Sequence, residues 1–167
     1  MLIRLAGLVP ESYVDGPGIR FTVFVQGCPH HCKGCHNPET HDFNGGRLAD
    51  VDKIFGKIIR DPLIKGVTFS GGEPFCQPEP LNYLAGMLKE KGYHVMSYSG
   101  YTFEELLKMS EENSDIKGLL EKLDILVDGR FELSQRSLEL KFKGSRNQRL
   151  IDVPKSLKEG RVVLCEI

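Results

Sequence analysis

Residues 20–35, RFTVFVQGCPHHCKGC, join a β-strand to a loop rich in cysteine. Residues 20–27 are mostly β-branched or aromatic and end at a glycine, a pattern that predicts a strand. Residues 28–47 are rich in Cys, His, Pro, Asn and Gly, which predicts an irregular loop with a functional role. The same order, a short apolar run followed by glycine, predicts three more strands at residues 66–70, 94–99 and 124–128.

Helical patterns lie between these strands. One apolar stripe starts at Leu48 and stops at Asp61-Pro62, and Thr102 with Glu105 forms a capping box for a later helix. Strands that alternate with helices predict a parallel sheet with right-handed crossovers. The chain has 167 residues, whereas a closed eight-stranded barrel takes ~250. We therefore expect an α/β fold, an open partial (β/α) barrel of parallel strands, with its chemistry at the carboxyl ends of the strands.

The last part of the chain is harder to assign. Residues 138–153 alternate weakly, and residues 161–165 predict a final strand without a defined place in the topology. The length favours one domain. We expect a single domain over residues 1–167, in which residues 132–167 form a C-terminal extension.

Composition excludes several classes of protein. The chain is 40% hydrophobic and 27% charged, which is ordinary for a globular protein. Its 22 basic and 23 acidic residues give a net charge of −1, which argues against nucleic-acid binding driven by bulk charge. No apolar run reaches the ~18 residues of a membrane helix, and no signal peptide is visible. We expect a cytoplasmic protein with no membrane or nucleic-acid partner.

Three of the five cysteines lie in one short loop, with the spacing C-x3-C-x2-C at Cys28, Cys32 and Cys35. An odd, clustered set favours metal binding or redox chemistry over disulfides. A structural zinc site or an iron–sulfur cube usually has four ligands. A fourth could come from a nearby side chain (His30, His31, His36, Cys76 or Cys165) or from outside the protein.

A ligand from outside the protein has a distinctive chemistry. A [4Fe-4S] cluster with three thiolates leaves one iron open, and that iron can bind the amino and carboxylate groups of S-adenosylmethionine. A zinc-binding module remains the alternative on spacing alone, and a thioredoxin-like site at Cys32 and Cys35 fits the third cysteine less well.

A second motif, Ser70-Gly71-Gly72-Glu73-Pro74, follows the second predicted strand. Two glycines let the backbone approach a ligand closely, and a carboxylate suits an ammonium group. A plain strand-to-loop turn is the alternative.

The cysteine spacing and the GGEP motif are typical of the radical S-adenosylmethionine superfamily. VDGPGIR at residues 14–20 and HNPET at residues 36–40 resemble the activases of glycyl-radical enzymes. Within that group the sequence is similar to the activating proteins of anaerobic ribonucleoside-triphosphate reductases. This similarity runs over nearly the whole chain and is carried by residues 27–46, 70–77, 98–106, 124–131 and 143–153.

The resemblance implies a radical S-adenosylmethionine fold with a [4Fe-4S] cluster and S-adenosyl-L-methionine as cofactors. Cys28, Cys32 and Cys35 would hold the cluster and be the catalytic residues. The residues implied to line S-adenosylmethionine are Gly34, Cys35 and His36, with Gly72 and Glu73 at its methionine end and Ser99 and Asp128 on its ribose or carboxylate side. Gly34 departs from the aromatic residue that many members carry there, so stacking on adenine is lost.

The implied reaction starts with an electron from a flavodoxin-like donor. Reductive cleavage then yields a 5′-deoxyadenosyl radical, which abstracts hydrogen from one glycine in the large subunit of the reductase. An activase of another glycyl-radical enzyme, such as pyruvate formate-lyase, is the alternative.

Three further features carry weaker signals. We expect Cys76 to be a small buried thiol and Cys165 to belong to the core. The basic stretch from Lys141 to Arg149 either docks the protein partner or is a solvated hairpin.

Overall fold

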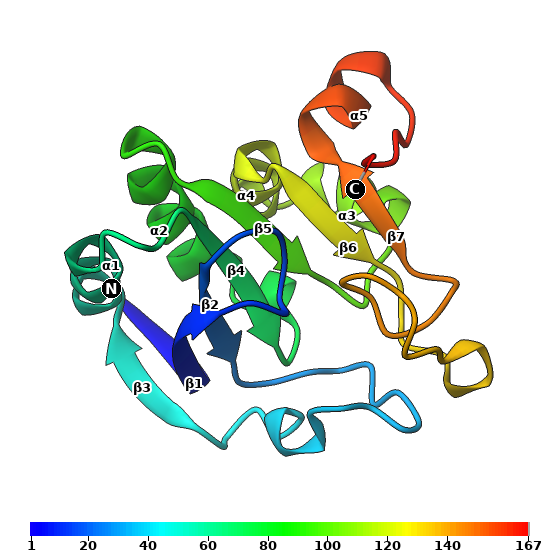
Figure 1. Cartoon of the computed structure of the whole chain (residues 1–167), viewed down its shortest axis with the longest axis horizontal. Helices are drawn as coiled ribbons and strands as arrows, with labels where there is room; N and C mark the ends of the chain where they lie inside the picture. Colours follow the sequence, from blue (N-terminus) through cyan, green and yellow to red (C-terminus); the bar gives the residue numbers. More distant parts are fainter. Residues whose placement is uncertain (167) are drawn as a thin grey trace.

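The computed structural model describes residues 1–166 as a mixed α/β fold around a seven-stranded sheet of order β3-β1-β2-β4-β5-β6-β7 (Figure 1). Its centre is parallel, as predicted. Each neighbouring pair in the series β2, β4, β5, β6 runs parallel. These four strands are β2 (Arg20–Val25), β4 (Gly66–Gly71), β5 (His94–Tyr98) and β6 (Ile125–Asp128).

The outer strands correct the expectation of a wholly parallel sheet. β1 (Leu2–Ser12) pairs antiparallel with both β2 and β3 (Arg47–Asp50), and β7 (Arg149–Asp152) pairs antiparallel with β6. β1 precedes β2 directly, so a short connection suffices for an antiparallel pair and no crossover helix is needed.

The helices are α1 (Val51–Arg60), α2 (Pro78–Glu90), α3 (Phe103–Ser110), α4 (Ser114–Lys122) and α5 (Val153–Glu159). They form one connected layer: α1 contacts α2, α2 contacts α4, and α4 contacts both α3 and α5 (Figure 1). A single core of Leu, Ile, Val and Phe side chains lies between this layer and the sheet. The burial of apolar surface there is the main stabilising contribution to the fold.

Local sequence signals explain most helix ends. Asp50 caps α1 by accepting from the Asp52 N–H, and Thr102 and Glu105 form the predicted capping box of α3. Pro78 stands in the first turn of α2, as expected. The helix predicted from Leu48 begins instead at Val51, because residues 47–50 pair with β1 as strand β3.

The sheet face opposite the main core carries a buried polar network. The Arg20 guanidinium donates to Thr68 Oγ1 at 2.7 Å, and Thr68 Oγ1 in turn donates to the Asp15 carbonyl at 2.7 Å. The connection between β1 and β2 therefore lies against this face, and Figure 1 shows it as a blue arc in front of β4 and β5. Burial lowers the pKa of Arg20 to about 10.

The C-terminal part differs from the predicted strand at residues 161–165. Only a single bridge, between Ile151 and Leu164, joins this segment to the sheet, and Leu164 is exposed. After α5 the backbone turns at Gly160, with φ +69°, and two backbone hydrogen bonds flank this bridge, from Asp152 N to the Val163 carbonyl and from Cys165 N to the Leu150 carbonyl. Within residues 1–166 no helix is long and apolar enough to cross a membrane.

Candidate active site

A cavity of about 680 Å³ opens at the carboxyl ends of the parallel strands. The turn after each of these strands contributes to its wall: Cys28 after β2, Gly72 after β4, Ser99 after β5 and Gly129 after β6. The sequence predicted that these turns meet at one edge, and the structure brings them together.

The three clustered cysteines all line this cavity as free thiols. Cys28 is 9% exposed, and Cys32 and Cys35 are half-buried. Among residues 1–166, no three His, Cys, Asp or Glu side chains converge on a point that would suit a single metal ion. In an iron–sulfur cube each thiolate binds a different iron, so three sulfurs around one cavity fit such a cluster.

Burial and nearby backbone N–H groups have opposite effects on the pKa values of the cysteine thiols. Burial raises the pKa of Cys28, and the nearby backbone N–H groups of His30 and His31 partly oppose this rise. Burial likewise raises the pKa of Cys32, opposed by the backbone N–H of Phe131. The Asn37 N–H donates to Cys35 Sγ at 3.4 Å. Hydrogen bonds of this kind are what proteins use to set the potential of an iron–sulfur cluster.

The two glycines of the GGEP motif let two strand ends approach each other closely. Gly72 N–H donates to the Val25 carbonyl and Glu73 N–H to the Gly27 carbonyl, both at 2.8 Å. A Cβ atom at Gly72 would overlap the Gly27 carbonyl oxygen. The motif therefore holds the cysteine loop against the end of β4 through the backbone.

The Glu73 carboxylate belongs to this packing and does not line the cavity. It is fully buried, and its oxygens accept four hydrogen bonds. The donors are His30 Nε2 at 2.7 Å, Gly100 N at 2.7 Å, Ser99 Oγ at 2.8 Å and Phe75 N at 3.0 Å. Ser99 lines the cavity, but its hydroxyl proton is directed to Glu73.

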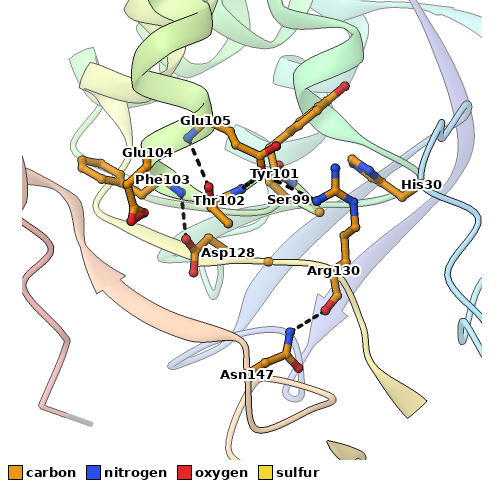
Figure 2. A network of polar contacts seen from close by, with 12 residues as sticks. His30, Ser99, Tyr101, Thr102, Phe103, Glu104, Glu105, Asp128, Arg130 and Asn147 are labelled. Atoms are coloured by element: carbon orange, nitrogen blue, oxygen red, sulfur yellow. Dashed lines mark hydrogen bonds and ion pairs between the residues drawn. The ribbon is translucent and has the colours of Figure 1, made fainter. Parts of the chain in front are cut away.

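Asp128 is also bound within the protein. Its carboxylate is 1% exposed and accepts from the Phe103 N–H, at 2.7 Å, and from Arg149. Figure 2 shows Asp128 beneath the first turn of α3, with His30 and Tyr101 on the other side of that turn. The side chain expected at S-adenosylmethionine is thus committed to holding α3 and β7, and it does not line the cavity.

Two residues predicted beside the third cysteine have different surroundings. His36 lines the cavity, and its ring lies 5.1 Å from that of Phe131. Gly34 does not line it; this residue has φ +76°, and a Cβ there would lie 2.9 Å from Leu133.

Sequence reasoning missed most of the wall formed by residues 129–148. Phe131, Phe142 and Gln148 line the cavity, as does Asp15 from the connection between β1 and β2. The stretches 124–131 and 143–153, which carried the resemblance, held the only signal for this wall. His41 also lines the cavity, and its Nε2 is the one buried side-chain polar atom without a partner among residues 1–166, as expected beside a group that binds there.

The two other cysteines are not placed as predicted. Cys76 is half-buried rather than buried, and burial with nearby Glu73 and Cys28 raises its pKa to about 11. Cys165 is half-buried at the margin of a small second cluster around Met96 and not in the main core.

Three thiols gathered at one cavity, at the carboxyl ends of the parallel strands, define an iron–sulfur protein with a single cluster site. The model of the family described as "4Fe-4S single cluster domain" matches residues 14–151. The anaerobic ribonucleoside-triphosphate reductase-activating protein of Haemophilus influenzae is 34% identical over 150 residues, which cover 83% of this chain and 91% of that protein. The protein of the same description from Escherichia coli K12 is 33% identical over 148 residues, or 83% of this chain and 92% of that one.

Two further matches are shorter. The pyruvate formate-lyase-activating enzyme of Clostridium pasteurianum is 39% identical over 117 residues, which cover 65% of this chain and 49% of that enzyme. This chain therefore spans about half the length of that relative. The crystal structure of QueE from Escherichia coli matches with a TM-score of 0.50 at 17% identity, over 60% of this chain and 53% of that one, a likeness in fold alone.

The chain belongs to the 4Fe-4S single cluster domain family and, within it, to the anaerobic ribonucleoside-triphosphate reductase-activating proteins. The expectation of a radical S-adenosylmethionine activase, with a [4Fe-4S] cluster and S-adenosylmethionine as cofactors, is thereby confirmed.

Proposed function

We propose that this chain activates an anaerobic ribonucleoside-triphosphate reductase by forming a glycyl radical on the large subunit of that enzyme. The observation that carries the proposal is the alignment with activating proteins over about nine-tenths of their length, with the cysteine triad of this chain gathered at one cavity. A flavodoxin-like protein would be the electron donor.

Cys28, Cys32 and Cys35 are the proposed cluster ligands, and the iron they leave open would bind S-adenosylmethionine. Together the two cofactors supply a one-electron reductive cleavage that yields a 5′-deoxyadenosyl radical, and the protein supplies binding, orientation and shielding. His36 and the Gly72 backbone are placed to contact S-adenosylmethionine, since both line the cavity. Gly34, Glu73 and Asp128 do not line the cavity and would act on its lining residues indirectly.

Apolar side chains shield the site. Phe24, Phe131 and Phe142 line the cavity, and Tyr98 Oη donates to the Phe142 carbonyl at 2.6 Å, which fixes one part of the wall. Such walls exclude water from the place where a reactive radical would form.

The proposed architecture is an open partial barrel of the radical S-adenosylmethionine type. β3 and β7 are the two edge strands of the sheet, so the sheet is open and does not close into a barrel. A glycine in a peptide loop has to reach the cavity, and an open edge admits it where a closed barrel would not. β7 and α5 come from the C-terminal extension and continue the same sheet and helix layer, which supports one domain. We place the protein in the cytoplasm.

The test is glycyl-radical formation by the reconstituted protein. Under anaerobic conditions the chain, loaded with iron and sulfide, is mixed with S-adenosylmethionine, a reductant and the large reductase subunit. We expect the electron paramagnetic resonance (EPR) signal of a glycyl radical on that subunit. Replacement of Cys28, Cys32 or Cys35 with Ala should abolish S-adenosylmethionine cleavage, while Cys165→Ala retains it.

A second assay separates the alternative reaction. Pyruvate formate-lyase takes the place of the reductase subunit in the same mixture. A radical on the lyase and none on the reductase would contradict the proposal and favour the activity named for the Clostridium relative. Cleavage retained in Cys28→Ala would contradict the proposed cluster site.

A further inference from the structure

His41 lies in a short segment whose backbone is bound to the start of the cysteine loop. Gly27 N–H donates to the Thr40 carbonyl at 2.7 Å. Cys28 N–H donates to the His41 carbonyl at 3.2 Å, and His41 N–H donates to the Pro38 carbonyl at 3.2 Å. Both backbone groups of His41 are therefore paired, and the residue is held beside the backbone of Cys28, the first of the proposed cluster ligands.

The His41 ring packs against a neighbouring ring, but one of its nitrogens has no partner. The ring lies edge-on to that of His31, with centroids 4.8 Å apart. Among residues 1–166, His41 Nε2 is the one buried side-chain nitrogen or oxygen without a hydrogen bond, and His41 lines the cavity that Cys28 also lines. Because an unpartnered buried polar atom is costly, a group bound in this cavity is the expected partner of Nε2.

The proposed cluster offers the acceptors that such an atom needs. Cys28, Cys32 and Cys35 would hold it in this cavity, and its sulfurs accept hydrogen bonds from protein donors. A histidine ring nitrogen that carries a proton is such a donor. Because the backbone of His41 is bound to that of Cys28, we assign the ring to the cluster and not to S-adenosylmethionine.

We propose that His41 Nε2–H donates a hydrogen bond to a sulfur of the cluster and so raises the reduction potential of the cluster. The reduced cluster carries one more negative charge than the oxidised one, so a hydrogen bond to sulfur stabilises the reduced form more. The inference rests on the proposed function and adds to the cluster site a side chain outside the cysteine triad.

The test is the potential of the reconstituted [4Fe-4S] cluster, measured by EPR during an anaerobic redox titration without S-adenosylmethionine or reductase. His41→Phe removes the donor and keeps an aromatic ring to pack against His31, so we expect its potential to shift to more negative values. His41→Gln keeps an N–H donor and should restore most of the wild-type potential. A potential equal to that of wild type in a loaded His41→Phe protein would overturn the inference.

Phe43→Leu is the matched control for packing in the same segment. Phe43 packs against Gly27 and does not line the cavity. Its replacement loosens this packing but removes no hydrogen-bond donor, so the potential should stay at the wild-type value. A shift as large as that of His41→Phe would assign the effect to packing and would also overturn the inference.

A spectroscopic measurement on the wild-type chain covers the case in which His41→Phe binds no cluster. The histidines are labelled with ¹⁵N, and pulsed EPR of the reduced cluster detects the nitrogen nuclei close to it. A weak nitrogen coupling that disappears in His41→Gln supports the hydrogen bond. A wild-type spectrum without histidine coupling, or one that His41→Gln leaves unchanged, would overturn the inference, as would a strong coupling, which marks a ligand of iron.

The proposed function and this inference fail in different ways. If the wild-type chain binds no [4Fe-4S] cluster, the cluster site itself is wrong. If the cluster forms and its potential does not depend on the side chain at position 41, only the role of His41 is wrong.

Discussion

Arg149 and Asp128 form a two-pronged ion pair between neighbouring strand ends of β7 and β6. Arg149 Nε donates to Asp128 Oδ1 at 3.0 Å, and Nη2 donates to Oδ2 at 2.5 Å. The same guanidinium reaches Glu104 on α3 at 2.6 Å. Arg149 was one of the basic residues considered for docking a partner, and the structure instead commits it to joining β6, β7 and α3.

Replacement of Arg149 with Met should destabilise the fold, because Asp128 would remain buried without its charge partner. Removing one partner of a fully buried pair costs about 3–5 kcal/mol. Arg149 is one-third exposed, so we expect about 2–3 kcal/mol, measured by urea unfolding. Arg146→Met, at an exposed neighbouring position, should stay within about 0.5 kcal/mol of wild type. Equal stability of the two variants would contradict this account of the pair.

Gly72→Ala should both destabilise the protein and impair cluster loading. The added Cβ meets the Gly27 carbonyl oxygen, a backbone atom next to Cys28 that cannot move independently of the loop. Gly56→Ala is the matched control, since Gly56 lies within α1 and a Cβ there meets nothing within 4 Å. That control should gain about 0.5–1 kcal/mol, because Ala favours a helix over Gly. Normal iron content in Gly72→Ala would show that the close approach is not required.

The stability of the chain should fall as the pH drops below about 7, because of His94. Arg20 Nη2 lies 3.0 Å from His94 Nδ1, and burial together with this cation lowers the pKa of His94. In the unfolded chain His94 has an ordinary pKa of about 6.5, so it binds a proton more readily there than in the folded protein. Stability is fully present above the unfolded pKa and is lost as the pH falls toward the folded value.

This pH dependence is measured as the free energy of unfolding in urea at a series of pH values. His94→Asn removes the titrating ring, so its curve should be flatter than that of wild type over about pH 5–7. Parallel curves for the two proteins would assign the slope to other groups.

The sequence predicted the four central strands because β2, β4, β5 and β6 are short, mostly buried runs that end in glycine or are followed by one within two residues. β3 and β7 could not be found in this way. Each has four residues, mostly half-exposed or exposed, and edge strands of that kind carry no periodic signal. They become strands only because β1 and β6 offer them a partner.

In the candidate site, too, some features were visible in the local sequence and others depend on residues far apart in the chain. The cysteine triad was visible because its spacing is local, and the structure gathers it at one cavity. The roles of Glu73 and Asp128 were not visible, because their decisive partners, His30 and Arg149, lie 43 and 21 residues away along the chain. A carboxylate next to a motif cannot be assigned to a ligand or to the protein until those partners are known.

Arg146 is an exposed basic side chain within residues 129–148, which form one wall of the cavity, and we expect it to contribute to binding of the reductase subunit. Arg146→Ser should weaken complex formation while S-adenosylmethionine cleavage in the absence of the subunit stays unchanged. An exposed charge acts mainly on the rate of association, so the effect should shrink as salt is raised. Surface plasmon resonance under anaerobic conditions measures it, and an association rate equal to that of wild type at low salt would contradict this role.

Cluster loading should depend on pH in the direction set by the thiols. Burial raises the pKa of Cys28 and Cys32, so both are protonated in the cluster-free protein at neutral pH, and iron has to displace their protons. Iron bound at limiting ferrous iron and sulfide should therefore rise with pH between about 7 and 9, across the usual range of thiol ionisation. Cys76→Ala should load to the same extent with the same pH profile, because Cys76 does not line the cavity although its pKa is raised to about 11. Loss of iron from this variant would instead make Cys76 a ligand, and loading that does not change with pH would mean that Cys28 and Cys32 are already ionised before the metal arrives.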